Sequence, residues 1–366
     1  MSGMSVGGGG GGAGAAGATG AGGYRRSGAG AQMAAEMGQQ PGVLARIVAR
    51  ADAVAETARS LTPSPYFAGT TIVARGSSDH ASVYGRYLLE LASGRPVSLA
   101  APSLHLLYDA RVDYRGQLAI AVSQSGATPE IVTTLARLRD AGARALAITN
   151  DRDSGLAHAA EATLAIDAGD ELAVPATKTV TGEMLLFALL ARGLGTVRFT
   201  DADLARLPDA VQAVLDDPGP SRAAATALAD ATRLVVTARG LLYGAALECA
   251  LKLQETTGIA ADAISSADLR HGPIAIVGEG FPVLALSAPG PARDDVAALV
   301  ATLRERGARV LEIACDPAAA LPLPAVVEGL APIVAVVRAQ QLARELALVR
   351  GRDPDAPAGL RKVTAT

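Results

Sequence analysis

Aromatic residues are scarce in this chain of 366 residues, which has no tryptophan, seven tyrosines and four phenylalanines. Half of the residues are nonetheless apolar, most of them alanine, leucine or valine. This composition is typical of helices that pack against buried parallel strands. Because a single core stops growing beyond roughly 250–300 residues, the length predicts two domains. The sequence therefore indicates an α/β protein with two cores.

The chain also lacks basic runs, long apolar runs and metal-ligand motifs. Its formal net charge of −3 argues against a nucleic-acid partner, and no run reaches the roughly eighteen apolar residues of a membrane helix. The two cysteines, Cys249 and Cys315, have neither disulfide nor zinc-site spacing, and no strand pattern precedes the glycine run at 7–12. We therefore expect a cytoplasmic protein that needs no metal or nucleotide cofactor and acts on a small molecule.

Three segments of the chain occur twice, in the same order and at nearly constant spacing. Ile72–Gly76 recurs as Val236–Gly240, 164 residues later, and 118–123 and 142–151 recur as 283–287 and 307–316. Regular spacing of this kind indicates duplication. Within each copy, short apolar runs alternate with amphipathic segments, a pattern typical of parallel strands joined by crossover helices. The sequence predicts two tandem, doubly wound, flavodoxin-like sheets with flanking helices, after a disordered Gly/Ala-rich tail at 1–31.

Hydroxyl-rich loops follow two strands of the first copy. Ser78 lies in the first loop, and the second loop carries Ser123, Gln124, Ser125 and Thr128 just before a helix. Hydroxyls and N–H groups at a helix N-terminus can bind a phosphate, although serine and threonine there can also be ordinary helix caps. The second copy lacks this hydroxyl set, although its helices need caps as well. We therefore favour phosphate binding in the first copy.

The second copy instead carries charged residues on an apolar helix. Glu248, Lys252 and Glu255 share one face of the segment 242–257, either as a surface salt-bridge row or as a functional cleft. Lys252 is one of three lysines in the chain, with Lys178 and Lys362, against thirty arginines. Since arginine can replace lysine wherever only charge is needed, each lysine is a candidate for amine chemistry or a chance survivor.

Histidines supply the remaining candidates for proton transfer. His271 lies before a Gly-Pro turn and His80 follows the first hydroxyl loop. A histidine titrates near neutral pH and can move a proton during the opening of a sugar ring. Either residue could also be an ordinary loop histidine, and for His80 we favour that interpretation.

Four motifs together resemble the tandem sugar isomerase (SIS) family: Ser123–Thr128, Ala176–Lys178, Ala246–Glu255 and Leu269–Pro273. The likeness runs from about Met33 to Thr364. It is nearest to the isomerase half of glucosamine-6-phosphate synthase (glutamine–fructose-6-phosphate aminotransferase) and to the SIS-type glucosamine-6-phosphate deaminases.

The resemblance implies a role for each matching residue. Glu255 would transfer the proton, Lys252 would be the helical lysine, His271 would open the ring from a neighbouring subunit, and Lys362 would act at the carbonyl. The implied substrate contacts are Ser78, Ser123, Gln124, Ser125, Thr128, Val174, Ala176 and Glu248. A homodimer and a sugar 6-phosphate substrate are also implied. We expect a first SIS domain at 32–205 with the phosphate-binding loops, a second at 206–350 with the catalytic helix, and a C-terminal tail at 351–366 that closes the active site.

Two departures from the synthase pattern guide the expected reaction. The chain begins with Met-Ser and a glycine-rich segment where the synthase has a glutaminase domain, so we expect that glutamine is not its nitrogen donor. Arg75–His80 is closer in sequence to the deaminase-like group. We therefore predict conversion of glucosamine 6-phosphate to fructose 6-phosphate and ammonia. An ammonia-dependent synthase, a deglycase of a related sugar-phosphate amine, a non-catalytic sensor and a transcription regulator remain as alternatives, the last disfavoured because 1–40 cannot form a helix-turn-helix.

Overall fold

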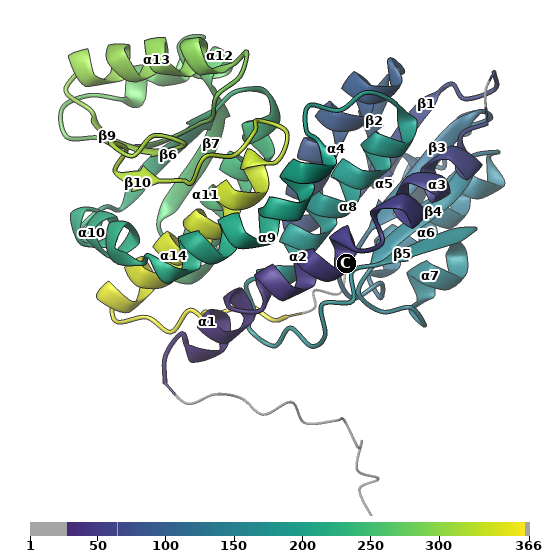
Figure 1. The fold of residues 1–366 in the computed structure, drawn as a ribbon, viewed down its shortest axis with the longest axis horizontal. Helices are drawn as coiled ribbons and strands as arrows, with labels where there is room; N and C mark the ends of the chain where they lie inside the picture. The colour runs from purple at the N-terminus through teal and green to yellow at the C-terminus, as the bar shows by residue number, and fades with distance from the viewer. Residues whose placement is uncertain (1–27, 64, 363–366) are drawn as a thin grey trace, which may run out of the picture.

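The computed structural model describes residues 28–63 and 65–362 and shows two α/β units side by side (Figure 1). The first unit follows three helices and contains five strands. Its elements are α1 (Ala31–Met37), α2 (Gln40–Val48), α3 (Ala51–Leu61), β1 (Gly69–Val73), α4 (Ser77–Ser93), β2 (Val97–Leu99), α5 (Pro102–Leu106), β3 (Gln117–Val122), α6 (Pro129–Asp140), β4 (Arg144–Thr149), α7 (Gly155–Ala159), β5 (Ala162–Ala165) and α8 (Lys178–Leu194).

The second unit repeats this plan. Its elements are α9 (Asp201–Asp216), α10 (Gly219–Ala227), β6 (Arg233–Ala238), the 3₁₀ turn η1 (Gly240–Leu242), α11 (Tyr243–Thr257), β7 (Ala260–Ser265), α12 (Ser266–Arg270), η2 (Pro273–Ile276), β8 (Pro282–Ser287), α13 (Arg293–Glu305), β9 (Arg309–Ala314), β10 (Leu321–Pro322) and α14 (Ala331–Val349).

Both sheets are parallel and have the same strand order. The first runs β2-β1-β3-β4-β5, and the second runs β10-β9-β8-β6-β7. When the strands of the second sheet are renumbered from one at β6 and read from the β7 edge, the order is 2-1-3-4-5 in both sheets. In the centre of the first sheet, Ile120 pairs with Ile72 of β1 and Leu146 of β4. All three side chains are buried, which explains why these strands read as continuous apolar runs. The predicted pair of doubly wound, flavodoxin-like sheets is confirmed.

Four helices lie between the sheets and join the two units into one core: α4, α8, α11 and α14 (Figure 1). Nearly every residue of α8 is buried, as expected for a helix without a solvent face. Gly244 permits the close approach of α11 to α4, because a Cβ there would lie 2.7 Å from the His80 carbonyl oxygen and 2.9 Å from the Tyr84 nitrogen. This contact brings the charged face of α11 to the N-terminus of α4.

The structure corrects two expected boundaries. The division at 205/206 falls inside α9, whose buried residues Leu204 and Leu207 lie on both sides of it. Most of the predicted disordered tail lies outside the described residues, but 28–31 are ordered. Their order comes from the C-terminal segment: Asp353 accepts a hydrogen bond from the Gly30 N–H, and Asp355 accepts two from the first turn of α1.

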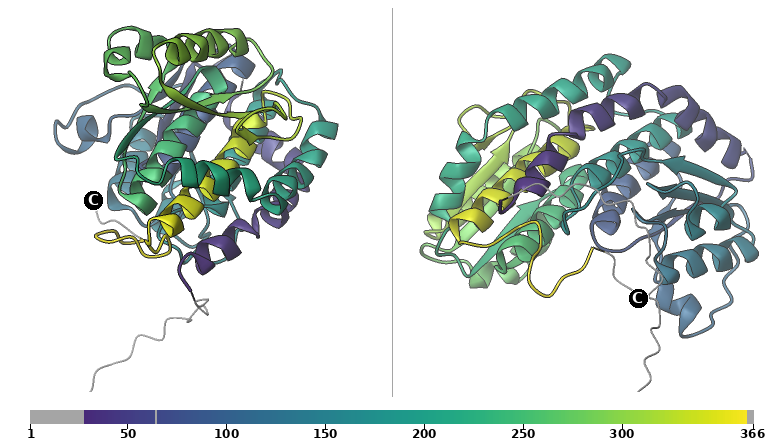
Figure 2. Two further views of the ribbon diagram at one scale, coloured as in Figure 1. Left: turned by 90° about the vertical axis from the view of Figure 1, so that its left-hand side faces the viewer. Right: turned by 90° about the horizontal axis from the view of Figure 1, so that it is seen from below.

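The C-terminal segment crosses from the second unit to the first. Its path after α14 is the yellow loop on the right of Figure 2. The Asp355 carbonyl accepts a hydrogen bond from the Val174 N–H at 3.0 Å. Residues 360–362 are thereby brought to the carboxyl ends of the first sheet. In the described part of the chain, no helix combines the length and apolarity needed to cross a bilayer.

Candidate active site

A cavity of about 350 Å³ opens beyond the carboxyl ends of β1 and β3. This is the switch point of the sheet, where the strand order reverses and where ligands bind in folds of this type. Its walls come from the two loops that follow these strands, from the segment before α8, from α11 and from the C-terminal segment. The residues that line it are Arg75, Gly76, Ser77, Ser78, Val122, Ser123, Gln124, Ser125, Thr128, Ile131, Val174, Ala176, Glu255, Leu360, Arg361 and Lys362.

The loop from Ser123 to Thr128 folds into an open cradle at the start of α6. The turn of this loop requires glycine at position 126, because Gly126 has a φ of 60° and because a Cβ there would overlap the Ser154 side chain. The Ser123 hydroxyl accepts a hydrogen bond from the Gly126 N–H at 3.2 Å and lies 3.4 Å from the Thr128 hydroxyl. With the N-termini of α4 and α6 both at this cavity, the loop presents dipoles and hydroxyls suited to a phosphate.

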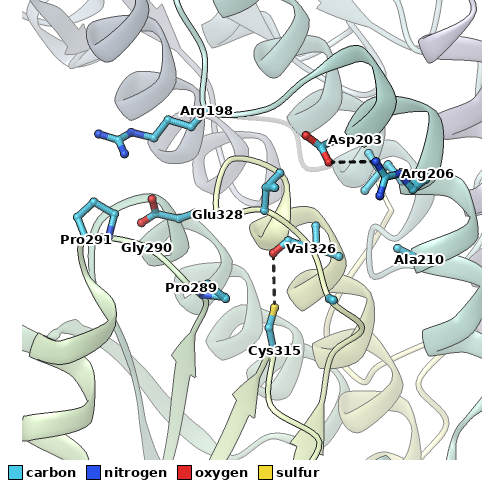
Figure 3. A pocket seen from close by; sticks show the side chains of 13 residues that line it. Arg198, Asp203, Arg206, Ala210, Pro289, Gly290, Pro291, Cys315, Val326 and Glu328 are labelled. Atoms are coloured by element: carbon cyan, nitrogen blue, oxygen red, sulfur yellow. Dashed lines mark hydrogen bonds and ion pairs between the residues drawn. The ribbon is translucent and has the colours of Figure 1, made fainter.

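The second unit has a cavity at the carboxyl ends of β8 and β9, and its chemistry is different (Figure 3). Its cavity of about 520 Å³ is lined by the Pro289–Pro291 loop after β8, by Cys315 after β9, and by Arg198 and Glu328. Figure 3 shows the Glu328 carboxyl beside Gly290, at the place where a Cβ on that glycine would lie. Burial raises the pKa of Glu328 despite the opposing effect of Arg198. The Pro289–Pro291 loop offers no side-chain hydroxyl, in contrast to the Ser123–Thr128 loop of the first unit.

Lys252 lies directly beneath the first cavity, between two glutamates. Its side chain is 0% exposed, and Nζ lies 2.5 Å from Glu255 Oε2, 3.3 Å from Glu248 Oε1 and 3.1 Å from the Ser77 hydroxyl. Burial alone would lower the pKa of Lys252, but Glu248 and Glu255 outweigh it and hold that pKa above its usual value. The lysine is therefore a fixed cation that orients Glu255, whose side chain keeps 21% exposure toward the cavity.

Glu248 and His80 extend this network away from the cavity. Glu248 is 1% exposed and does not line the cavity, so its expected role as a substrate contact is replaced by a supporting one. Its Oε2 lies 2.9 Å from His80 Nδ1. Burial acts to raise the pKa of Glu248, but Lys252 and His80 outweigh it and hold the pKa below its usual value. His80, which the sequence suggested to be an ordinary loop residue, thus lies on α4 and contacts Glu248 behind the cavity.

Glu171 holds the C-terminal lysine at the cavity. Its buried carboxylate accepts hydrogen bonds from Lys362 Nζ at 2.8 Å and from the N–H and hydroxyl groups of Thr177 and Thr179. Burial acts to raise the pKa of Glu171, but Lys362 and these hydrogen bonds keep it below its usual value. Sequence reasoning missed Glu171. Its sequence gave little signal, because Glu171 is one of three acidic residues, with Asp167 and Asp170, in the loop before the Ala176–Lys178 motif.

The structure therefore brings most of the expected site residues to one cavity. Ser78, Ser123, Gln124, Ser125, Thr128, Val174, Ala176, Glu255 and Lys362 line it. Lys252 and Glu248 lie behind its wall.

His271 is exposed at the C-terminal end of α12 and does not line the cavity of its own chain, so its role across a dimer stays a prediction. Lys178 is buried at the start of α8, bound to Gln39 and the Asp170 carbonyl, and acts as an anchor. In the described ranges, no three histidine, cysteine or acidic side chains cluster as a metal site.

Sequence comparison supplies the family. The SIS domain matches residues 70–192 and, a second time, residues 227–349. The chain belongs to the SIS-domain family. Each match contains one of the two parallel sheets described above, which confirms the resemblance inferred from the motifs.

The sequence relatives of this SIS-domain chain include aminotransferases. It is 34% identical over 299 residues to the isomerizing glutamine–fructose-6-phosphate aminotransferase of Methanothermobacter thermautotrophicus, a match that covers 79% of this chain and 50% of the relative. The corresponding enzyme of Thermus thermophilus is 35% identical over 308 residues, covering 80% of this chain and 51% of the relative. The chain thus spans about half the length of these relatives.

Solved structures with the same two-domain SIS architecture are also similar. A candidate phosphosugar isomerase of Silicibacter pomeroyi DSS-3 superposes with a TM-score of 0.78 at 32% identity, covering 88% of this chain and 99% of that one. Glucosamine-6-phosphate deaminase of Thermotoga maritima superposes with a TM-score of 0.75 at 22% identity, covering 92% and 100% of the two chains. The second likeness concerns the fold alone.

Proposed function

We propose that this protein converts glucosamine 6-phosphate and water to fructose 6-phosphate and ammonia. The observation that carries the proposal is the position of the Glu255 carboxylate, held by Lys252, in the same cavity as the hydroxyl loop 123–128. A cavity of about 350 Å³ lies within the usual range for small-ligand sites. One end of the cavity suits a phosphate, and the other carries a carboxylate that can accept and return a proton.

The proposed reaction begins with binding and ring opening. Ser78, Ser123, Gln124, Ser125 and Thr128 hold the phosphate, while Val174 and Ala176 border the sugar. His271 of a neighbouring subunit moves a proton between the ring oxygen and O1, which yields the open-chain aldehyde. Fixing the phosphate orients the open chain, so that C1 and C2 lie near Glu255.

Proton transfer and hydrolysis follow. Glu255 takes the proton from C2, and the C2–H electron pair forms a C1–C2 double bond as negative charge develops on O1. Lys362 stabilises that charge. Glu255 then returns the proton to C1, and a proton passes from the C2 amino group to O1, which leaves a hydroxyl at C1 and an imine at C2. Water adds to C2, the C2–N bond breaks, and fructose 6-phosphate and ammonia are released. Because Lys252 is enclosed, we assign it to positioning Glu255 rather than to the amine chemistry for which the sequence made it a candidate.

The decisive experiment is a product assay. Purified protein incubated with glucosamine 6-phosphate should release fructose 6-phosphate and ammonia in equal amounts. Release of neither product, with an intact substrate, contradicts the proposal. Glucosamine 6-phosphate formed from fructose 6-phosphate and ammonium, in the absence of the forward reaction, would favour the second candidate.

That second candidate is an ammonia-dependent synthase. It is favoured by the aminotransferases at 34–35% identity. We expect that glutamine supports no amino-sugar formation by this chain, because no cysteine that could attack the glutamine amide lines the described cavity. The measurement is glucosamine 6-phosphate formed from fructose 6-phosphate with glutamine or with ammonium as the nitrogen source. Glutamate released from glutamine by the pure chain contradicts this prediction.

Removing a hydroxyl from the loop is expected to weaken substrate binding. Ser125→Ala or Thr128→Val should each raise the dissociation constant roughly 10- to 150-fold, since a hydrogen bond to a charged group contributes about 1.5–3 kcal/mol. Binding of fructose 6-phosphate by titration calorimetry measures the effect. Ser287→Ala, at the end of β8 in the second unit, is the matched control and should bind as the parent does. Unchanged affinity in both loop variants rules out the phosphate assignment.

A further inference from the structure

A buried carboxyl group lies directly behind the proposed phosphate site and has no part in the reaction described above. Glu183 is on α8 and is 1% exposed. Its Oε1 lies 2.9 Å from the Ser78 hydroxyl oxygen, whereas its Oε2 has no hydrogen-bond partner among the described residues. A buried carboxylate with one unpaired oxygen is costly, so the neutral acid is the more stable form in this place.

Ser78 connects this carboxyl group to the cavity. The residue lines the cavity at the start of α4, and its hydroxyl has a single proton to donate. When Glu183 is ionised, that proton is donated to the carboxylate, and Ser78 can offer a substrate oxygen no hydrogen bond. When Glu183 is protonated, its own O–H can donate to the Ser78 oxygen, and the Ser78 proton can point into the cavity.

We propose that Glu183 is a positioning residue whose protonated carboxyl group turns the Ser78 hydroxyl toward the substrate phosphate. The inference rests on the proposed function, because it takes Ser78 to be a phosphate contact. It adds a condition to that function: the phosphate site is complete only while Glu183 is neutral. Ionisation of Glu183 removes the Ser78 donor and places a negative charge behind a dianionic ligand.

The surroundings of Glu183 favour the neutral form near pH 7. Burial raises its pKa to about 8, opposed by the hydrogen bond from Ser78 and by the charge of Lys362. Two carboxylates, Glu171 before α8 and Glu248 on α11, raise the pKa further. The group should therefore be protonated at neutral pH and should lose its proton as the pH rises through about 8.

Other charged residues on the elements packed against α8 are engaged elsewhere. On α4, His80 contacts Glu248, Asp79 interacts with His80 and Arg75, and Arg86 pairs with Glu90. On α3 and α2, Asp52 pairs with Arg192, Glu56 pairs with Arg59, and Arg46 binds the Asp167 carbonyl. On α14 and β4, Arg338 binds the Asp217 and Pro322 carbonyls, Arg344 pairs with Glu345, and Arg144 pairs with Glu161.

The test is the pH dependence of binding of sorbitol 6-phosphate, which has no carbonyl and cannot react. Between pH 7 and 9.5 the phosphate stays a dianion, because its second pKa is about 6. For the parent we expect affinity to fall about 10- to 30-fold over this range with a midpoint near 8, since only the protonated fraction binds well. Glu183→Gln should bind with nearly constant affinity, because its amide donates to Ser78 at every pH.

Two further results separate this inference from the proposed function. Ser78→Ala should bind more weakly than the parent at pH 7 and should lose most of the pH dependence. A parent profile that is flat, or that Glu183→Gln shares, overturns the role of Glu183 while leaving the phosphate site intact. Absence of sorbitol 6-phosphate binding at any pH overturns the phosphate assignment and this inference with it. The parent profile alone remains a test if the Glu183→Gln variant fails to fold.

Discussion

Replacing Glu255 with glutamine should lower turnover about 10²–10⁴-fold, the usual contribution of a general acid–base group. The amide keeps the shape of the side chain and can still accept a hydrogen bond from Lys252, but it cannot accept the C2 proton. Substrate binding should survive, because the phosphate contacts lie on other elements. The effect should therefore appear in kcat, with little change in the dissociation constant.

Solvent-deuterium exchange separates a catalytic role of Glu255 from a structural one. In the parent, deuterium should enter at C1 or C2 during turnover, and in Glu255→Gln this exchange should fall in step with kcat. Glu305→Gln, an exposed position on α13, is the matched control and should behave as the parent. If the folded Glu255→Gln variant binds substrate and exchanges the proton at near the parent rate, Glu255 is only a structural partner of Lys252.

Lys252→Met should be the most destabilising single change in the site. It leaves Glu248 buried without its cation, and breaking a buried ion pair in this way costs about 3–5 kcal/mol. The free energy of unfolding in urea measures the loss. Adding Glu248→Gln to Lys252→Met removes the unpaired charge and should recover part of it, which a double-mutant cycle reports. Equal stability of Lys252→Met and the parent contradicts the assignment of Lys252 as a structural cation.

The same ion pair predicts how stability varies with pH. The folded-state pKa of Glu248 is lowered, so its contribution is present above the unfolded-state value and is lost as pH falls through the folded one. The pKa of Lys252 is raised, so its contribution is present below the unfolded-state value and is lost as pH rises through the folded one. Glu248→Gln should flatten the acid side of the stability profile more than the alkaline side.

The fold and the position of the hydroxyl loop were predictable because their signals are local. Apolar runs such as Leu118–Val122 and the Ser123–Thr128 loop specify a strand, a turn and a helix start within a few residues. Comparison of the two copies also showed that the second copy lacks this hydroxyl set. The i, i+4 and i+7 spacing on α11 correctly placed Lys252 beside Glu248 and Glu255.

The supporting residues could not be predicted in the same way. Glu171, Glu183 and His80 acquire their roles from partners that are 191, 105 and 168 residues away in the chain. These contacts depend on how α4, α8 and α11 pack together and on where the C-terminal segment returns. No local pattern encodes that packing, so nothing in the sequence next to these residues indicated their partners.

The link between α1 and the C-terminal segment has a consequence for when the protein can first work. Asp353 and Asp355 bind the start of α1, and Lys362, a little further along the same segment, completes the cavity. A ribosome makes the first unit, with both hydroxyl loops, long before it makes these residues. The nascent chain can therefore fold its hydroxyl loops early, but it acquires the last wall of the cavity only once Lys362 has left the ribosome. Until then, the proposed site is incomplete.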